Sequence, residues 1–207
     1  GFKTSDKIAR SLGIEIDSPF RIQSGIRYVI NEFCANGHTF MPKDELIKEA
    51  SNVLTVSGDI IEENIKNAAL DRKIKLEKVN DKEGVFTIPN YYCELGITNR
   101  ILTLAISNFQ DISVDVEHLI LQFEKKNNIT FAESQKDAII SAFQNGIEII
   151  TGGPGTGKTT IIKCIIEIFE TCGLKVLLGA PTGRAAKRMS ESTGKEATTI
   201  HRMLDMG

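Results

Sequence analysis

The sequence predicts an α/β nucleotide-binding domain of the phosphate-loop class, preceded by a mostly helical region, and three observations indicate it. Residues 152–160 fit the phosphate-loop pattern G-x-x-x-x-G-K-[ST]. A β-branched run at residues 147–151 is typical of a buried strand, and the apolar residues at 160–169 are typical of a helix. Before the loop, apolar residues recur mainly at helical spacing.

Each residue type in the loop suits phosphate binding. Glycines let backbone N–H groups turn inward at the positive end of a helix, where they can hold a triphosphate. Lys158 is placed to reach the β- and γ-phosphates, and the Thr159 hydroxyl to complete the shell of a bound Mg²⁺. A glycine-rich turn without a ligand is the alternative. The residues predicted to bind the nucleotide are Gly152, Gly153, Pro154, Gly155, Thr156, Gly157, Lys158, Thr159 and Thr160, with Lys158 and Thr159 also catalytic.

Composition is that of an ordinary globular protein. The 207 residues are 41% apolar and 25% charged, which is enough for two small domains with a buried core. A net charge of -2 argues against a polybasic protein that coats nucleic acid by charge alone. The four cysteines form no C-x-x-C pair, so free thiols in a reducing cytosol are expected. Without a signal pattern or a bilayer-length apolar run, we expect a cytoplasmic protein with no membrane contact.

The first domain that we expect, residues 1–18, opens on a glycine and continues as a short helix ending at Gly13. Ile8, Ala9 and Leu12 are predicted to point inward. The pattern is similar to the second half of a helix-hairpin-helix motif, whose hairpin offers backbone N–H groups to DNA phosphates. A plain capped helix is the alternative.

The second domain, residues 19–92, contains the parts of a winged helix: three amphipathic helices, a short extended piece after the first, and a closing hairpin. The hairpin strands are predicted at residues 74–79 and 85–88, with residues 80–84 as the turn. Acidic residues on the third helix make it poor for phosphate contact, so a spacer or protein-contact role is favoured over DNA binding.

Residues 93–128 form a predicted helical connector, and residues 129–207 the start of the nucleotide-binding domain. A second apolar strand is expected at residues 175–180, giving a right-handed, parallel strand–helix–strand crossover with residues 147–151. A Pro-Thr-Gly turn then opens a basic helix. At the carboxyl end of a parallel strand, this turn places the Thr182 hydroxyl, backbone N–H groups and Arg184 where a ligand would lie.

Four motifs in order resemble the first motifs of RecD-like DNA helicases, the exodeoxyribonuclease V alpha-subunit family. They are Phe131-Ala132-Glu133-Ser134-Gln135, the loop at 152–160, Ala180-Pro181-Thr182-Gly183-Arg184-Ala185-Ala186 and Thr199-Ile200-His201-Arg202. The helix-hairpin-helix remnant and the helical region resemble the N-terminal extension of stand-alone members. The resemblance covers the whole chain, strongly from about residue 130 onward.

The resemblance implies a RecA-like motor that uses ATP and Mg²⁺ to move 5′ to 3′ on DNA and unwind it during repair and recombination. Single-stranded DNA and duplex junctions would be its partners. Gln135 would read adenine, Thr182, Gly183 and Arg184 would hold the single-stranded DNA backbone, and His201 would lie near the DNA path. An exposed glutamine, a solvated arginine and a packed histidine are the alternatives for Gln135, Arg184 and His201.

The sequence departs from the family because it holds no later acidic residue for Mg²⁺ and water, and no second motor lobe with arginines. We therefore expect a truncated, N-terminal fragment of a helicase, without turnover of its own. Two other functions stay open at this point: a different phosphate-loop NTPase, and a DNA-binding module whose nucleotide loop is structural.

Overall fold

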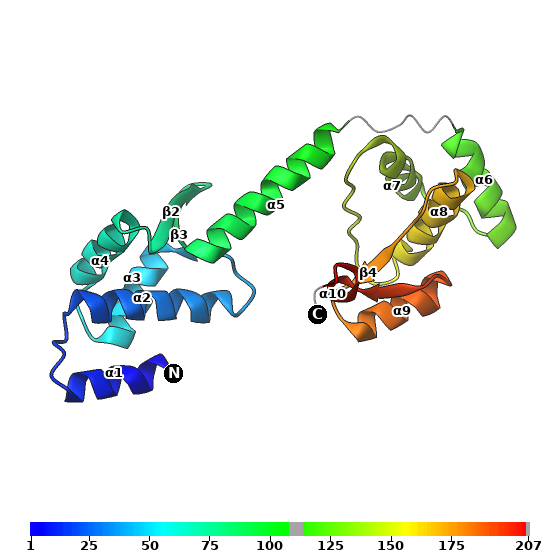
Figure 1. Ribbon diagram of the computed structural model, residues 1–207. Coiled ribbons are helices and arrows are strands. Elements are labelled where there is room, and N and C mark those ends of the chain that lie inside the picture. The colour runs from blue at the N-terminus through cyan, green and yellow to red at the C-terminus, as the bar shows by residue number, and fades with distance from the viewer. Residues whose placement is uncertain (108–113, 206–207) are drawn as a thin grey trace. The chain divides into compact units, whose positions relative to one another are not determined.

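The structure is a computed structural model that describes residues 1–107 and 114–205 (Figure 1). Contacts divide the chain into two compact units, Gly1–Arg100 and Ile101–Gly207. The finer division at 1–18, 19–92, 93–128 and 129–207 stays a prediction. No helix in the described part of the chain is both long and apolar enough to cross a membrane.

The first unit is helical with a small antiparallel sheet. Its strands lie in the order β1-β3-β2. The elements are α1 (Phe2–Ser11), α2 (Pro19–Cys34), β1 (Met41–Pro42), α3 (Lys43–Leu54), α4 (Gly58–Leu70), β2 (Ile74–Val79) and β3 (Lys82–Thr87), and α5 (Ile88–Ile106) begins directly after β3. The three helices that the sequence predicted within residues 19–92 are present as α2, α3 and α4.

The core of the first unit lies between α2, α3, α4 and the sheet. Its members include the fully buried Ile26, Leu54 and Ile61. Gly25 allows α2 to approach α3 closely, because a Cβ built on Gly25 would lie 2.5 Å from Leu54 Cδ2. The apolar stripes of the helices thus close a core of their own inside this unit.

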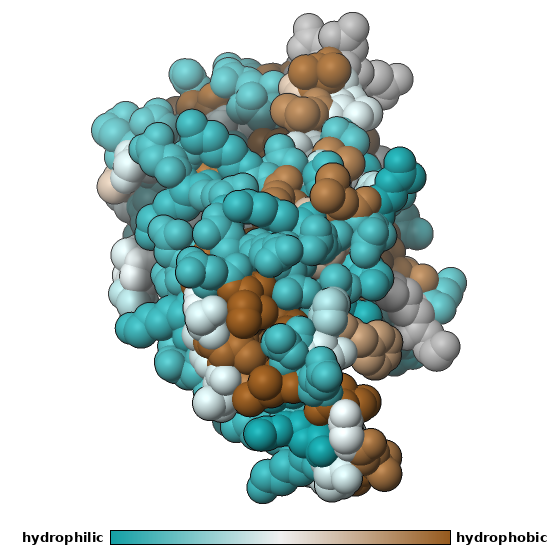
Figure 2. Space-filling view, turned by 90° about the vertical axis from the view of Figure 1, so that its left-hand side faces the viewer, coloured by the Kyte–Doolittle hydropathy of each residue, from teal (hydrophilic) through white to brown (hydrophobic). Residues whose placement is uncertain are grey.

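The inward face of α1 differs from the prediction. Ile8 and Leu12 are 55% and 79% exposed, so their predicted inward orientation is wrong. The contact face is set by a polar anchor: the buried Arg21 guanidinium donates to both Asp6 carboxylate oxygens at 2.6 and 2.9 Å. Phe2 stacks on the Tyr28 ring beside it, with centroids 5.0 Å apart. Figure 2 shows the face that lies on the left in Figure 1, and this face is mostly hydrophilic with apolar patches among the polar side chains.

The closing hairpin has a tighter turn than predicted. Val79 pairs with Lys82, so the turn is Asn80-Asp81 and the five-residue turn at 80–84 is wrong. Asn80 has a φ of 56°, a left-handed conformation that asparagine adopts readily. Gly84 therefore lies within β3, where a Cβ would come within 2.7 Å of the Phe40 ring.

The second unit combines three packed helices with a two-stranded parallel sheet. Its elements are α6 (Val116–Asn127), α7 (Glu133–Gln144), α8 (Lys158–Thr171), β4 (Leu178–Ala180), α9 (Gly183–Thr193), β5 (Ala197–Thr199) and α10 (Ile200–Met203). Ile120, Ile139 and Ile165 lie in a core shared by α6, α7 and α8, and Phe123 stacks on Phe131.

The predicted crossover through the phosphate loop is wrong in detail. Residues 147–151 form no strand, and Ile149 is 79% exposed. A strand requires a partner for its backbone groups, and no described segment pairs with these residues. The parallel pair is instead β4 and β5, with Leu178 opposite Ala197 and α9 as the connection. The predicted strand at 175–180 shortens to β4, and β5 is a strand that was not predicted.

Candidate functional site

The phosphate loop is placed by α8. This helix buries Ile161, Cys164 and Ile165 in the core shared with α6 and α7, which fixes the position of its N-terminus. Gly157 is the N-cap, and its carbonyl accepts the first helical bond from Ile161 N at 3.0 Å. The preceding turn, Pro154-Gly155, leaves the loop against the positive end of a 14-residue helix.

The loop conformation requires its glycines. Gly155 and Gly157 have φ values of 76° and 81°, which residues with a Cβ adopt only with strain. At Gly152, a Cβ would lie 2.6 Å from Thr156 Oγ1. The loop is therefore a cradle of backbone groups that side chains would fill, and this fits the phosphates of a nucleotide.

Lys158 lies against this loop. Its Nζ donates to the Gly152 and Gly153 carbonyls at 2.5 and 2.6 Å and approaches Thr156 Oγ1 at 3.3 Å. The Thr156 hydroxyl donates to the Gly153 carbonyl at 2.9 Å. A positive charge thus sits within the loop, where charge-assisted hydrogen bonds to phosphate oxygens would be strong. Thr159 is exposed in the first turn of α8, and Thr160 is half-buried behind it.

The structure brings Gln135 to the same loop from a different helix. Gln135 is the third residue of α7, and its Nε2 donates to the Thr156 carbonyl at 2.9 Å. Its Oε1 accepts a bond from Ala132 N at 2.9 Å. A residue 21 positions before Thr156 therefore belongs to the phosphate-loop site.

The four predicted DNA contacts gather at one edge of the small sheet. Ala180 pairs with Thr199, so the carboxyl ends of β4 and β5 meet at the same edge. Thr182 and Gly183 follow β4 at the start of α9, with Arg184 exposed in its first turn, and the exposed His201 follows β5 in α10. The Thr182 hydroxyl accepts from Ala185 N at 3.2 Å and so caps α9.

Comparison with known proteins matches both ends of the chain. Residues 135–207 match a family model described as an AAA domain, and residues 1–40 match one described as the ATP-dependent RecD2 DNA helicase HHH domain. The RecD2 helicase of Deinococcus radiodurans is 29% identical over the whole chain. At both ends, the chain is therefore similar to RecD-like helicases. The AAA match also assigns a phosphate-loop NTPase fold to the second unit of this RecD-like chain.

Two further relatives show where the similarity is concentrated. The RecD subunit of the RecBCD enzyme of Haemophilus influenzae is 39% identical over 44% of the RecD-like chain. The matched region is 14% of the length of that subunit. The ATP-dependent DNA helicase dda of Enterobacteria phage T4 is 52% identical over 27% of the chain and 13% of its own length. The chain spans 30% of the length of the Deinococcus relative.

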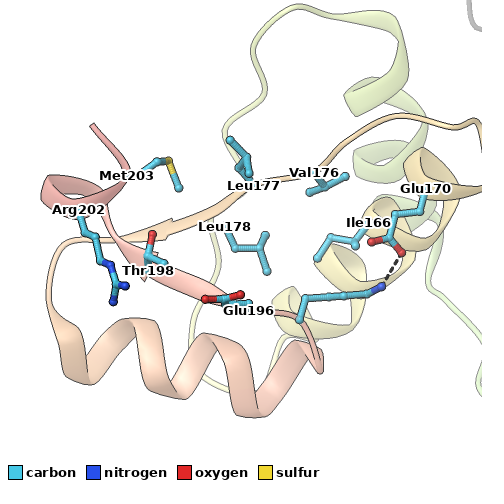
Figure 3. A pocket seen from close by; sticks show the side chains of 10 residues that line it. Ile166, Glu170, Val176, Leu177, Leu178, Glu196, Thr198, Arg202 and Met203 are labelled. Atoms are coloured by element: carbon cyan, nitrogen blue, oxygen red, sulfur yellow. Dashed lines mark hydrogen bonds and ion pairs between the residues drawn. The ribbon is translucent and has the colours of Figure 1, made fainter. Parts of the chain in front are cut away.

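A cavity of about 470 Å³ in the RecD-like chain lies beside the small sheet, and sequence reasoning missed it (Figure 3). Leu178 and Thr198 of the sheet, Ile166 of α8 and Met203 of α10 line it. Met203 reaches it because Gly179 has no Cβ: one there would lie 2.8 Å from Met203 Cε. The Glu170–Lys195 ion pair, at 2.6 Å, lies at this cavity.

Cys164 is a buried structural thiol in the core of the second unit. Burial, followed by the nearby Glu167 and Glu124 carboxylates, raises the pKa of the Cys164 thiol to about 12. The thiol is therefore protonated at neutral pH and packs as an apolar group. Among the described residues, no group of three or more His, Cys, Asp or Glu side chains could hold a metal ion.

Proposed function

We propose that the RecD-like chain provides the first part of an ATP-dependent DNA helicase that unwinds duplex DNA in repair and recombination, moving 5′ to 3′. The single observation that supports it most is the phosphate loop, where the Lys158 ammonium lies against the Gly152 and Gly153 carbonyls at the N-terminus of α8. The order of motifs from Gln135 to His201 and the RecD and RecD2 relatives support the reaction class. The direction of movement rests on the family resemblance.

In this proposal, ATP supplies the free energy for movement, and the chain's own residues bind and orient it. The backbone N–H groups of Gly153 and residues 155–160 and the Lys158 ammonium hold the phosphates, and Gln135 contacts the adenine edge. The Thr159 hydroxyl contributes one ligand to Mg²⁺. The positive φ values of Gly155 and Gly157 support this assignment, because they are what an anion-binding turn requires.

We assign single-stranded DNA and duplex junctions to the edge where β4 and β5 end. The N-terminal turn of α9 offers backbone N–H groups there, and Thr182, Gly183, Arg184 and His201 lie beside it. Arg184, Lys187 and Arg188 make the start of α9 basic, which suits phosphate contact. The work on DNA would take place in the cytoplasm.

We assign the helices and hairpin of the first unit to a winged helix, preceded by a helix-hairpin-helix element. Three helices closed by a β2–β3 hairpin support the first assignment, and the match of residues 1–40 supports the second. Glu62 on the third helix pairs with Lys43 and Lys66. Acidic charge on this helix favours a spacer or protein-contact role over reading a DNA groove.

Nucleotide binding by the 207-residue chain tests the proposal directly. Lys158→Ala is expected to weaken ATP affinity by about tenfold or more, because a charge-assisted bond to phosphate is lost. Lys163→Ala, an exposed lysine further along α8, is the matched control and should change little. Equal ATP affinity in the two variants would indicate that the loop has only a structural role.

DNA-dependent activity tests the reaction class on the full-length gene product. Hydrolysis of ATP should rise with single-stranded DNA, and Arg184→Ala should weaken DNA binding more than Arg27→Ala, an exposed arginine of the first unit. A rate of ATP hydrolysis that does not change when DNA is added would instead indicate a phosphate-loop NTPase of another class.

A further inference from the structure

The side-chain amide of Gln135 makes two hydrogen bonds that join separate parts of the second unit. Nε2 donates to the Thr156 carbonyl and Oε1 accepts from Ala132 N, each at 2.9 Å. Only one orientation of the amide satisfies both, since one partner is an acceptor and the other a donor. The side chain therefore bridges the N-terminus of α7 and the middle of the phosphate loop.

The loop is shaped to receive this side chain. A Cβ on Gly157 would lie 2.6 Å from Gln135 Nε2, so the glycine that caps α8 also makes room for the amide. Helix α7 holds Gln135 in register, because Ile139 one turn later is fully buried against α8. Phe143, another turn along, packs on Phe169 with ring centroids 4.3 Å apart.

We propose that Gln135 is a positioning residue for the phosphate loop, fixing the Thr156 carbonyl so that the loop is preformed before any nucleotide binds. This role is additional to contact with the base, and it rests on the proposed function only in taking the loop as the phosphate site.

The amide has the capacity for both roles. A glutamine side chain offers two N–H donors and an oxygen with two lone pairs, and the bonds to Thr156 and Ala132 use one of each. One donor and one lone pair remain, which is the set that an adenine edge pairs with. The contact with the base and the hydrogen bond to the loop would therefore be made by the same amide group.

The distinguishing test uses a ligand that has no base. Gln135→Met keeps the length of the side chain and removes both hydrogen bonds, and Gln144→Met, an exposed position at the end of α7, is the matched control. Affinities of the 207-residue chain for ATP and for inorganic tripolyphosphate are measured by calorimetry. Amide hydrogen exchange of Gly153 and residues 155–157 is followed without ligand.

A positioning role predicts that Gln135→Met weakens tripolyphosphate binding by about three- to tenfold, the worth of one or two hydrogen bonds. It also predicts faster exchange in Gly153 and residues 155–157 before ligand is added, with Gln144→Met like the parent in both. Weaker ATP binding with unchanged tripolyphosphate binding and exchange would overturn the proposal and leave a base contact only. Failure of Lys158→Ala to affect either ligand would instead reject the loop as a phosphate site.

Discussion

The two units differ in how completely their apolar segments are buried and paired within the described chain. In the first, the helix stripes meet each other and a three-stranded sheet, and Ile26, Leu54 and Ile61 are fully buried. In the second, the helices are packed, but residues 147–151 have no strand partner and Ile149 is 79% exposed. The difference shows that an amphipathic helix can close a core with its neighbours, whereas an apolar strand depends on whatever lies beside it.

The largest expected effect contrasts a core isoleucine in one unit with an exposed isoleucine in the other. Ile26→Ala should lower the free energy of unfolding of the first unit by about 2–5 kcal/mol, because it removes packed methyl groups and leaves a cavity. Ile149→Ala should change the free energy of unfolding of the second unit by less than about 0.5 kcal/mol, as for other exposed positions. Denaturant unfolding followed by circular dichroism measures both, and equal losses would contradict the contrast between the units.

A smaller loss is expected where the first unit uses polar rather than apolar contacts. Asp6→Ala should destabilise the first unit by about 2–3 kcal/mol, because it leaves the buried Arg21 guanidinium without its carboxylate. Asp17→Ala, at an exposed position just before α2, is the control. Hydrogen exchange should quicken most in α1, and protection of α1 equal to that of the parent would show that Arg21 does not hold it.

In the second unit, two glycines of the phosphate loop have left-handed φ values. Gly157→Ala should cost about 1–2 kcal/mol, because alanine at a φ of 81° is strained and its Cβ meets Gln135 Nε2. The loss should appear as faster exchange around residues 152–158, with thermal unfolding of the first unit unchanged. A variant as stable and as protected as the parent would mean that the loop relaxes freely.

The smallest effect concerns the surface charges of the first unit and depends on pH. The Glu83 and Glu62 carboxylates raise the pKa of Lys43, and Lys43 together with Lys66 lowers the pKa of Glu62. The contribution of the Glu62 carboxylate to stability is present at a pH above its ordinary pKa of 4.5. It is lost as the pH falls through the lower pKa of the folded state. The contribution of Lys43 is present at a pH below its ordinary pKa of 10.5. It is lost as the pH rises through the higher pKa of the folded state.

Lys43→Met should therefore be less stable than the parent near pH 7, and the difference should shrink toward both extremes. High salt should also reduce it, since the partners are partly exposed. Urea unfolding at several pH values and two salt concentrations measures the difference, with Lys48→Met on the same helix for comparison. A difference independent of pH would assign the effect to packing of the lysine stem.

Most of the helices could be predicted because their period is a local property of the sequence. The phosphate loop could be predicted as well, since its glycines and Lys158 follow one another in the chain. The face of α1 could not, because the buried Arg21–Asp6 pair outweighs the apolar Ile8 and Leu12. Strand pairing and the cavity beside Met203 depend on distant residues, which no local pattern contains.

The approach of Gln135 to the loop lies between these cases. Its position was expected from the family resemblance, but its bond to the Thr156 carbonyl depends on how α7 packs against α8. A sequence can indicate that two motifs share a site, whereas the atoms that join them emerge only from the packing of their helices.

The two threonine caps at the sheet edge restrict what can bind there. Thr182 Oγ1 accepts from Ala185 N, and Thr199 Oγ1 accepts from Arg202 N. Each hydroxyl uses one lone pair in its cap and keeps its hydrogen as a donor for a ligand. A ligand at this edge therefore meets two hydroxyl donors in neighbouring loops, and this suits an oxyanion.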